Sequence, residues 1–582
     1  MRTSTRVELG LYDVTARTDS TPSSADAQSW ADVTADLRRD RIPALPKYGT
    51  LEDHQFLMDG SFELFPERPQ GQFWGLWSRQ QSGPDGRFAW PPVLDIRFAK
   101  PHSSAGLTFH FYAPTDDWAS EMKIEWLDGG GNLLESAHFY PDRVNFYCEK
   151  KVGSYQRMRI TFLATNHPGR YLKMTSLDYG AAMTFAGEDV IQAKVLEEVD
   201  SLSNEITINT LDLTLYSREA QFSLLNPDGV SDMLQDKQRF TVWEDVQADK
   251  RSPDVVSHNM GTFYLTDWKN KSDTVSTFSA VDAVGLLDGD PFDGGIYDTT
   301  ADALAAQILT GYEYTLDPTL ARERVRGYIP AGTRRTALQQ LAFALGAVVD
   351  CSRSAQIKIY PPPERPSSLI GCNRKFANGS VSMRPLITGV SVTAHQYRLQ
   401  TATEELYKTE LPTGTHKVTF RSPVKVGQVS GAALLESGNT FAVLRVDTPG
   451  EVTITGQTYE DACTVLHKLA ADLPPNAQPN ELQVQEATLV SPDRADAVAQ
   501  RLLATYANRI EQTFRMCAGS EMLADMLLVE STQGSMVRGQ LLRMEFDLTG
   551  GFLADVRVVG RCTDKPAALY CGETYAGGGE LL

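Results

Sequence analysis

Short stretches of alternating apolar and polar residues, separated by turn-forming residues, are the feature that most limits the fold of this 582-residue chain. Every second side chain of a strand points to the same face, so the alternation is typical of strands with one buried face. Residues 93–98, 107–111, 122–126 and 158–162 show this pattern, and the glycine-rich segment 128–132 predicts a turn. The chain is therefore predicted to be mainly β.

A smaller α+β portion is predicted from three stretches with helical spacing, at 300–309, 334–349 and 492–510. In the second stretch, Thr333 is placed to cap the start and Gly346 lies near the end. The apolar residues on one face of this helix are Leu338, Leu341, Ala342 and Leu345.

Length and composition limit the class of protein. At roughly 150 residues per domain, the chain predicts about four domains. It has no apolar run long enough for a transmembrane helix and no apolar signal segment at its start. We therefore expect a protein that stays in the cytoplasm or leaves the cell without a signal, as in lysis. The seven cysteines include no CxxC pair, which favours scattered reduced thiols over disulfides or a zinc site.

The formal net charge of −19 argues against a surface that grips nucleic acid through its phosphates. An acidic channel wall would instead repel phosphates and leave DNA mobile. Simple solubility is the alternative explanation of the charge, and both readings stay open at this point.

Several segments between residues 188 and 562 resemble, in the same order, motifs of the tail-hub family of tailed phages. These are the baseplate hub proteins of contractile tails and the N-terminal hubs of tail-associated lysins. Each motif is short, and the order over a long stretch carries the resemblance. The matching segments are 200–215, 225–229, 240–243, 261–268, 279–287, 325–342, 493–510 and 547–552.

The resemblance implies a structural subunit of the tail tip, not an enzyme. Such a hub closes the tail tube, adapts its sixfold symmetry to a threefold spike or fibre, and forms part of the DNA-ejection channel. Each subunit would carry two related β-barrels with a small helical unit between them, and three copies would present six barrels in a ring. Strand edges would pair around that ring, which gives otherwise aggregation-prone edges a use.

The domain order expected from this resemblance has seven parts, and residues 380–460 are expected to add strands to the second barrel. The parts are an N-terminal strand and arm of the hub (1–47), an inserted domain (48–182), the first barrel (183–290), a small α/β unit (291–370), a β-rich hub domain (371–480), the second barrel with its helix (481–565) and a C-terminal tail (566–582). Residues 15–34 of the arm are polar and predicted to be a loop.

Partners and location also follow from the resemblance. The chain is expected to form a homotrimer, with a distal tail protein or tube ring above and a spike, fibre or receptor-binding protein below. The tape measure protein is a further partner, and DNA passes only transiently. The expected location is the virion tail tip, after synthesis in the host bacterial cytoplasm and release by lysis. No cofactor and no metal is implied.

Residues 48–182 carry a second resemblance, to the galactose-binding-like jelly roll of discoidin and carbohydrate-binding modules. It rests on segments 107–112, 122–129 and 158–162, with regularly spaced strands typical of a β-sandwich. Four tryptophans could stack on sugar rings, although core or interface packing is an equally direct use of them. They are Trp74, Trp77, Trp90 and Trp118. The first alternative function is therefore a tail adhesin that binds a cell-surface glycan.

A cell-wall hydrolase is the second alternative. The sequence contains no HExxH, no GxSxG elbow and no Walker A motif, and its nine histidines are spread singly. Carboxylates are plentiful, so a glycosidase pair remains open on composition alone. Without a motif that assembles catalytic groups, we expect no catalytic residue.

Overall fold

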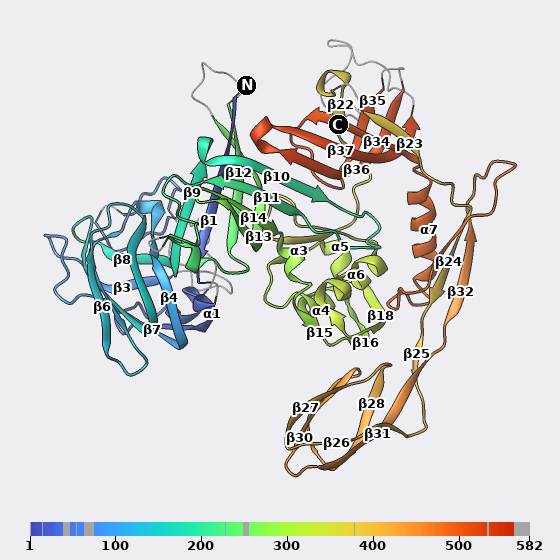
Figure 1. Ribbon diagram of the computed structural model, residues 1–582, viewed down its shortest axis with the longest axis horizontal. Helices are drawn as coiled ribbons and strands as arrows, with labels where there is room; N and C mark the ends of the chain where they lie inside the picture. Colours follow the sequence, from blue (N-terminus) through green and yellow to red (C-terminus); the bar gives the residue numbers. More distant parts are fainter. Residues whose placement is uncertain are drawn as a thin grey trace.

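The computed structural model describes residues 2–13, 15–38, 47–53, 55–62, 75–226, 229–247, 255–376, 379–531 and 535–563. Figure 1 shows a lobe formed by β3–β8, a large sheet beside it, a helical unit below that sheet and a β arm projecting away from the body. The chain is mainly β with a smaller α+β portion, as predicted. In the described part of the chain, no helix is long and apolar enough to span a membrane.

A 13-stranded sheet forms the body of the molecule. The strands of its first half are β1 (Arg2–Tyr12), β9 (Gly180–Ala186), β10 (Val190–Glu198), β11 (Thr210–Tyr216), β12 (Arg239–Gln247), β13 (Val256–Ser272) and β14 (Val275–Val281). They lie in the order β10-β11-β14-β13-β12-β1-β9 with antiparallel neighbours. The strand at the start of the chain therefore lies between β9 and β12, whose paired residues are at least 168 positions away in the sequence.

The second half of the sheet has the order β22-β35-β36-β37-β34-β23. Its strands are β22 (Pro366–Ile370), β23 (Ser380–Met383), β34 (Ile510–Cys517), β35 (Met526–Glu530), β36 (Met536–Asp547) and β37 (Leu553–Thr563). The predicted hairpin near residue 550 is confirmed, because β36 and β37 pair across the short 3-10 turn Leu548–Gly550. Strand β10 pairs with β36, with Lys194 opposite Asp547, and this pairing joins the two halves.

One hydrophobic core covers the buried face of both halves of the sheet. The alternation in β12 turns Phe240 and Val242 inward, and β37 does the same with Val556 and Val558. Burial of this apolar area, at about 25 cal/mol per Å², is the main force that holds the halves together. The two halves therefore fold as one unit.

A separate seven-stranded antiparallel sheet is built from residues between β1 and β9. Its order is β3-β8-β4-β7-β5-β6, with β2 beside β4. The strands are β2 (Ser20–Ser23), β3 (Leu76–Gln81), β4 (Val93–Phe111), β5 (Ala119–Leu127), β6 (Leu133–Phe139), β7 (Asn145–Thr165) and β8 (Tyr171–Asp178). The predicted turn at 128–132 is confirmed, and Gly131 takes the positive φ that it requires.

Two expectations for this inserted domain need correction. Residues 93–98 and 107–111 belong to one 19-residue strand, β4, whose register against β7 shifts three times, so bulges bend one strand where two were expected. Residues 15–34 are not a loose arm. The helices α1 (Ala16–Asp19) and α2 (Val33–Asp36) and strand β2 pack on the inserted sheet and add Ala16 and Val33 to its core. The jelly-roll topology itself stays a prediction.

The α/β unit follows the first half of the sheet. Its helices are α3 (Ala283–Leu286), α4 (Ala301–Ile308), α5 (Pro318–Ala321) and α6 (Arg334–Leu345), and its strands are β15 (Pro291–Phe292), β16 (Gly295–Thr300), β17 (Tyr314–Leu316), β18 (Arg324–Ile329), β19 (Gly332–Thr333), β20 (Val348–Asp350) and β21 (Ile357–Tyr360). Thr333 and Thr336 form a capping box at the start of α6, and Gly346 ends it with φ of 72°. The predicted start is therefore confirmed, whereas the helix ends at Leu345, four residues before the predicted end, because Gly346 takes a left-handed conformation and Val348–Asp350 form β20.

Most of residues 380–460 lies outside the central sheet, whereas they were expected to add strands to a second barrel with residues 480–562. Strand β24 (Gly389–Ala394) pairs with β32 (Thr464–Leu469) and β33 (Glu481–Val484), beside helix α7 (Ala495–Tyr506). The arm in Figure 1 has a small core of its own around Leu444 and Ile454, which lets it fold away from the barrel. Its strands are β25 (Tyr397–Leu399), β26 (Glu404–Leu411), β27 (Gly414–Thr419), β28 (Val424–Ser430), β29 (Ala433–Ser437), β30 (Phe441–Val446) and β31 (Gly450–Asp461).

Candidate assembly interface

Strand β23 is an end of the 13-stranded sheet and exposes an apolar edge. It pairs with β34 on one side, from Ser380 opposite Thr513 to Met383 opposite Ile510. The side chains of Val381 and Met383 are 70% and 67% exposed. A free strand edge with exposed apolar side chains and no charge is a template for pairing with another chain. This edge is the strongest candidate for an assembly contact on the central sheet.

A buried ion pair fixes the segment that carries the chain from β22 to β23. Arg374 of this segment donates hydrogen bonds to both carboxylate oxygens of Glu521, at 2.6 and 3.0 Å. The same carboxylate accepts from Ser368 Oγ and from the backbone N–H of Gly519, both at 2.9 Å. Burial opposes ionisation, but the hydrogen bonds and charge of Arg374 hold the pKa of Glu521 below its ordinary value. The contact therefore holds the start of this segment against the loop before β35.

The opposite end of the sheet, β9, is partly covered by the inserted domain. Thr108 of β4 donates to the carbonyl oxygen of Gly180 at 2.8 Å. Gly180 has φ of 152°, and a Cβ there would lie 1.9 Å from the carbonyl oxygen of Leu11, so the position requires glycine. The β9 end thus lies against the chain's own domain, whereas the second half of the sheet ends in β22 and β23.

Histidines tie the inserted domain to the end of β1. His102 places its two ring nitrogens 2.6 Å from a carboxylate oxygen of Asp13 and 2.8 Å from one of Asp19. The hydrogen bond from His102 lowers the pKa of Asp19. Within the inserted domain itself, His110 of β4 contacts Asp178 of β8 at 2.8 Å. This junction holds the inserted domain in a defined position beside the central sheet.

The inserted domain also contains a buried ionic cluster. Lys173 Nζ lies 2.6 Å from carboxylate oxygens of both Glu52 and Asp117, and all three side chains are almost fully buried. The ammonium group also lies over the rings of Trp77 and Tyr112, at 5.3 and 5.5 Å from their centroids. The cluster fixes residues 47–53 against β8.

The four tryptophans proposed as sugar contacts do not share one surface among the residues that the structure describes. Trp77 is buried beside Lys173, whereas Trp90 is 76% exposed. Trp118 is half-buried, and its indole N–H donates to the carbonyl oxygen of Pro141 at 3.0 Å. Trp74 lies outside the described residues. A sugar contact at these positions stays a prediction, and Trp90 is the most accessible described member of the set.

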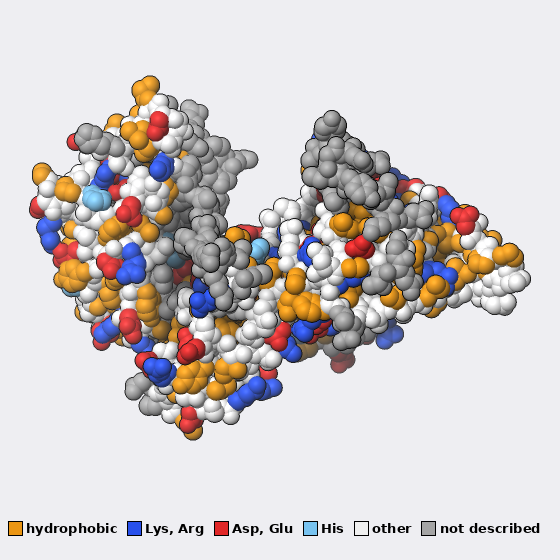
Figure 2. Space-filling view, turned by 90° about the horizontal axis from the view of Figure 1, so that it is seen from above, with side chains coloured by type: hydrophobic (Ala, Val, Ile, Leu, Met, Phe, Trp, Pro, Cys, Tyr) orange, Lys and Arg blue, Asp and Glu red, His pale blue; other side chains and the backbone are white. Residues whose placement is uncertain are grey.

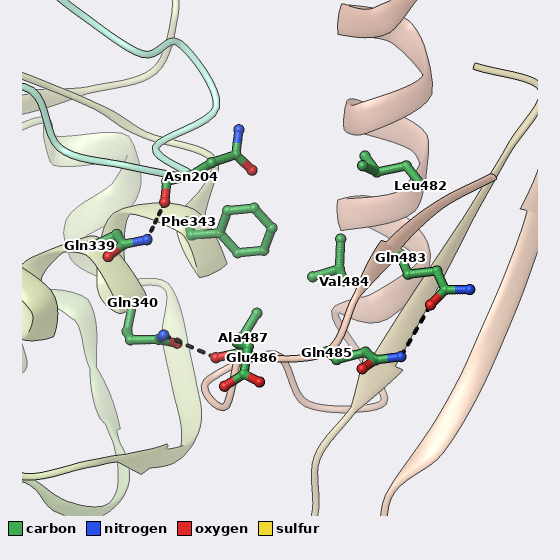
Figure 3. A pocket seen from close by; sticks show the side chains of 10 residues that line it. All are labelled: Asn204, Gln339, Gln340, Phe343, Leu482, Gln483, Val484, Gln485, Glu486 and Ala487. Carbon is green, nitrogen blue, oxygen red and sulfur yellow. Dashed lines mark hydrogen bonds between the residues drawn. The ribbon is translucent and has the colours of Figure 1, made fainter. Parts of the chain in front are cut away.

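Cavities surround α6 and α7, where the α/β unit meets the second half of the sheet. One of about 210 Å³, shown in Figure 3, is lined by amides and apolar side chains. There Gln340 Nε2 donates to the carbonyl oxygen of Glu486 at 3.0 Å, and Gln485 donates to Gln483 at 3.3 Å. Glu486 is the one acidic residue in its lining. The groups of this cavity are better suited to packing than to proton transfer.

No group of three or more His, Cys, Asp or Glu residues with metal-site geometry occurs among the described residues. Strongly shifted carboxyl groups lie inside the fold instead of in these cavities. Burial raises the pKa of Glu244 to about 7 and that of Asp282 to about 7. Both side chains are buried under the central sheet or at its border with the α/β unit.

The functional features of the edge were not predicted residue by residue. Val381 and Met383 alternate in a stretch of only four residues, which is too short for a clear strand signal. Arg374 and Glu521 are 147 positions apart, so no local pattern connects them. The sequence indicated only in general that the strand edges of a ring-forming subunit pair with neighbouring subunits.

Comparison with known proteins gives matches among solved structures alone, since no family model and no curated protein matches the chain. A 43 kDa tail protein of prophage MuSo2 from Shewanella oneidensis is 12% identical, with a TM-score of 0.38, over 65% of this chain and 96% of that one. The tail protein from Neisseria meningitidis MC58 is 10% identical, with a TM-score of 0.38, over 65% and 93%.

A prophage tail protein, gp18 from Listeria monocytogenes EGD-e, is 9% identical, with a TM-score of 0.36, over 65% of this chain and 91% of that one. All three are described as tail proteins.

Proposed function

We propose that this chain is a structural hub protein of a phage tail tip, which assembles as a homotrimer and closes the tail tube. The observation that carries the proposal is the pairing of β10 with β36, which joins two halves of one sheet. In the proposal, each half is one half-barrel. Three such subunits present six half-barrels, the number needed to match a sixfold tube above to a threefold spike or fibre below.

The edges of the sheet support this proposal. Strand β23 exposes Val381 and Met383 and has an unpaired side among the described strands. In a monomer this edge would be an aggregation hazard, and pairing with a neighbouring subunit removes it. With the β9 end partly covered by the inserted domain, β22 and β23 remain as ends of the sheet, and β23 has the more exposed apolar residues.

The DNA-ejection channel belongs to the same proposal. The ring of half-barrels would surround the path of the DNA, with a distal tail protein or tube ring, the tape measure protein and a spike or receptor-binding protein as neighbours. In Figure 2, acidic and basic side chains are interspersed over the face shown. The channel would therefore be acidic only if each subunit turned a face rich in acidic side chains inward. This acidic lining is part of the proposal.

The test is the mass of the purified protein in solution. Wild-type protein is expected at about 190 kDa, three times the 64.2 kDa of the chain. Val381→Glu with Met383→Glu places charge on the edge and should give monomers. Val465→Glu is the matched control, because Val465 is exposed on β32 outside the central sheet. A wild-type monomer at high concentration, or equal dissociation of the control, would contradict the proposal.

Glycan binding by the inserted domain is a second candidate function. Trp90 exposes 76% of its surface, and the domain lies at one end of the molecule in Figure 1. An exposed aromatic ring at the periphery is suited to stacking on a sugar ring. Screening of the full chain against bacterial surface glycans tests this function, and the absence of any ligand that depends on Trp90 would remove it.

A further inference from the structure

A cavity of about 600 Å³ lies between α7, the end of α6 and the second half of the central sheet. Its volume is in the range of roughly 300–1,000 Å³ that is typical of ligand clefts. Three arginines and a single acidic residue, Glu364, are among the residues that line it. We call it the arginine cleft, and its three arginines are Arg501, Arg538 and Arg561.

The floor of the arginine cleft brings like charges together. Arg538 of β36 and Arg561 of β37 are direct partners across the antiparallel ladder. Like charges in this position destabilise a strand pair unless an anion lies between them. The same ladder has a second direct arginine pair, Arg543 and Arg557, but both of its members have acidic partners: Arg543 contacts Glu545 at 2.9 Å and Arg557 contacts Glu198 at 2.7 Å. The pairing of Arg538 with Arg561 therefore needs a separate explanation.

The roof adds a third guanidinium. Arg501 of α7 donates through Nη2 to the carbonyl oxygen of Phe343 at 2.6 Å, at the end of α6. Its Nε is buried without a hydrogen-bond partner. Burial, together with the charge of Arg494, lowers the pKa of Arg501 to about 10. The charged form of Arg501 is therefore less stable here than in water, and a bound anion would stabilise it.

None of the three arginines forms an ion pair with a carboxylate in the described part of the chain. Arg538 instead donates to the carbonyl oxygen of Glu364 at 2.6 Å. Guanidinium groups form paired hydrogen bonds with carboxylates and phosphates, and clusters of them are a known means of recognising acidic or phosphorylated segments. An anion is therefore the ligand that this arrangement lacks.

The chemistry of one wall of the arginine cleft favours one kind of anionic ligand over another. It consists of Pro361, Pro362 and Pro363, which have fixed φ angles and no N–H group. The hydrogen-bonding atoms that the prolines can offer are carbonyl oxygens, which need a donor. A peptide supplies backbone N–H donors and carboxylates together, whereas a phosphate backbone supplies acceptors alone.

We propose that the arginine cleft binds an acidic peptide segment of a partner protein. Arg501, Arg538 and Arg561 would donate hydrogen bonds to the carboxylates of this peptide. The site does not depend on the trimer, because all of its groups come from one chain. Arg561 is exposed and has no described ion-pair partner, so its replacement should leave the fold intact.

Binding of a short peptide of alternating glutamate and serine to the full chain, measured by calorimetry, tests the proposal. Arg561→Gln or Arg538→Gln should weaken binding by roughly tenfold or more, as for loss of a charged hydrogen bond. Arg445→Gln, on the projecting arm, is the control and should not change it. Without ligand, Arg561→Gln should keep or raise the melting temperature, because it removes a like charge opposite Arg538.

Four results would overturn the proposal. They are unchanged peptide binding by Arg561→Gln and Arg538→Gln, equal binding of the matching glutamine peptide, tighter binding of an oligonucleotide than of the peptide, and binding of inorganic phosphate alone. The last two would assign the arginine cleft to nucleic acid or to adventitious anions.

Discussion

Arg374 Nη1 lies 2.6 Å from Glu521 Oε1, and its Nη2 lies 3.0 Å from Oε2, so the two side chains meet in a two-point contact. Glu521 is almost fully buried, whereas Arg374 keeps some access to water. The pair connects the segment before β23 to the segment before β35. It therefore joins two segments that are far apart in the sequence.

Glu521→Ala is expected to destabilise the protein by about 2–3 kcal/mol. This is below the ~3–5 kcal/mol for breaking a fully buried pair, because Arg374 can partly rehydrate. Urea unfolding followed by circular dichroism measures the change. The control is Asp555→Ala, which breaks the exposed ion pair of Asp555 with Arg515 and should cost less than about 1 kcal/mol. Equal effects of the two variants would show that the contact of Arg374 with Glu521 has no special role.

The pH dependence of stability should show the effect of Glu244. Its carboxylate accepts from Thr5 Oγ1 at 2.9 Å, and burial raises its pKa to about 7 from an ordinary value of 4.5. Between these values the folded state holds a proton that the unfolded state has lost, so the free energy of unfolding falls as the pH rises from 4.5 to 7.

Glu244→Gln should remove the contribution of Glu244 to this pH dependence, so the free energy of unfolding of the variant should fall less between pH 4.5 and 7. Unfolding curves measured across this pH range test the prediction. Glu8→Gln on the neighbouring strand β1 is the control, since Glu8 is only partly buried, and it should leave the pH profile unchanged. An identical profile for wild type and Glu244→Gln would contradict the assignment.

The contact between Glu52 and Lys173 should hold residues 47–53 in place. Glu52→Ala leaves the buried Lys173 with Asp117 as its remaining described ion-pair partner. The free energy of unfolding is expected to fall by about 3 kcal/mol or more, as for a broken buried pair. Thermal unfolding measures the loss, with Asp53→Ala, at an exposed neighbouring position, as the control. If Glu52→Ala unfolds at the wild-type temperature, the cluster does not anchor this segment.

Local patterns predicted the local features of the fold. The cap residues of α6, Thr333 and Gly346, were placed correctly because their side-chain or backbone requirements act within one helical turn. The hairpin of β36 and β37 was also predicted, since its two strands are adjacent in the sequence. Alternation along single strands predicted the mainly β class.

Contacts between distant segments could not be read in the same way. The pairing of Lys194 with Asp547 joins strands more than 350 positions apart, and alternation in either strand leaves its partner undetermined. The like-charge pair Arg538 and Arg561 depends on the register of two strands, which hydropathy does not reveal. For the same reason, the separation of the projecting arm from the second barrel was missed.

If the inserted domain binds glycans, Trp90 should be its main described contact. Trp90→Ala is expected to weaken binding by about 1–2 kcal/mol, comparable to an aromatic contact, with little change in stability because the ring is exposed. Trp77→Ala should instead destabilise the fold, because this ring packs beside Lys173. Glycan binding that Trp90→Ala leaves intact would argue against this surface.

The most direct test of the central claim is a density map of an intact tail particle that contains this chain. The proposal predicts three copies at the tail tip, with six half-barrels in a ring around the channel and β23 of each copy beside a neighbouring subunit. A different location in the particle, or copies whose β23 edges face solvent, would contradict it.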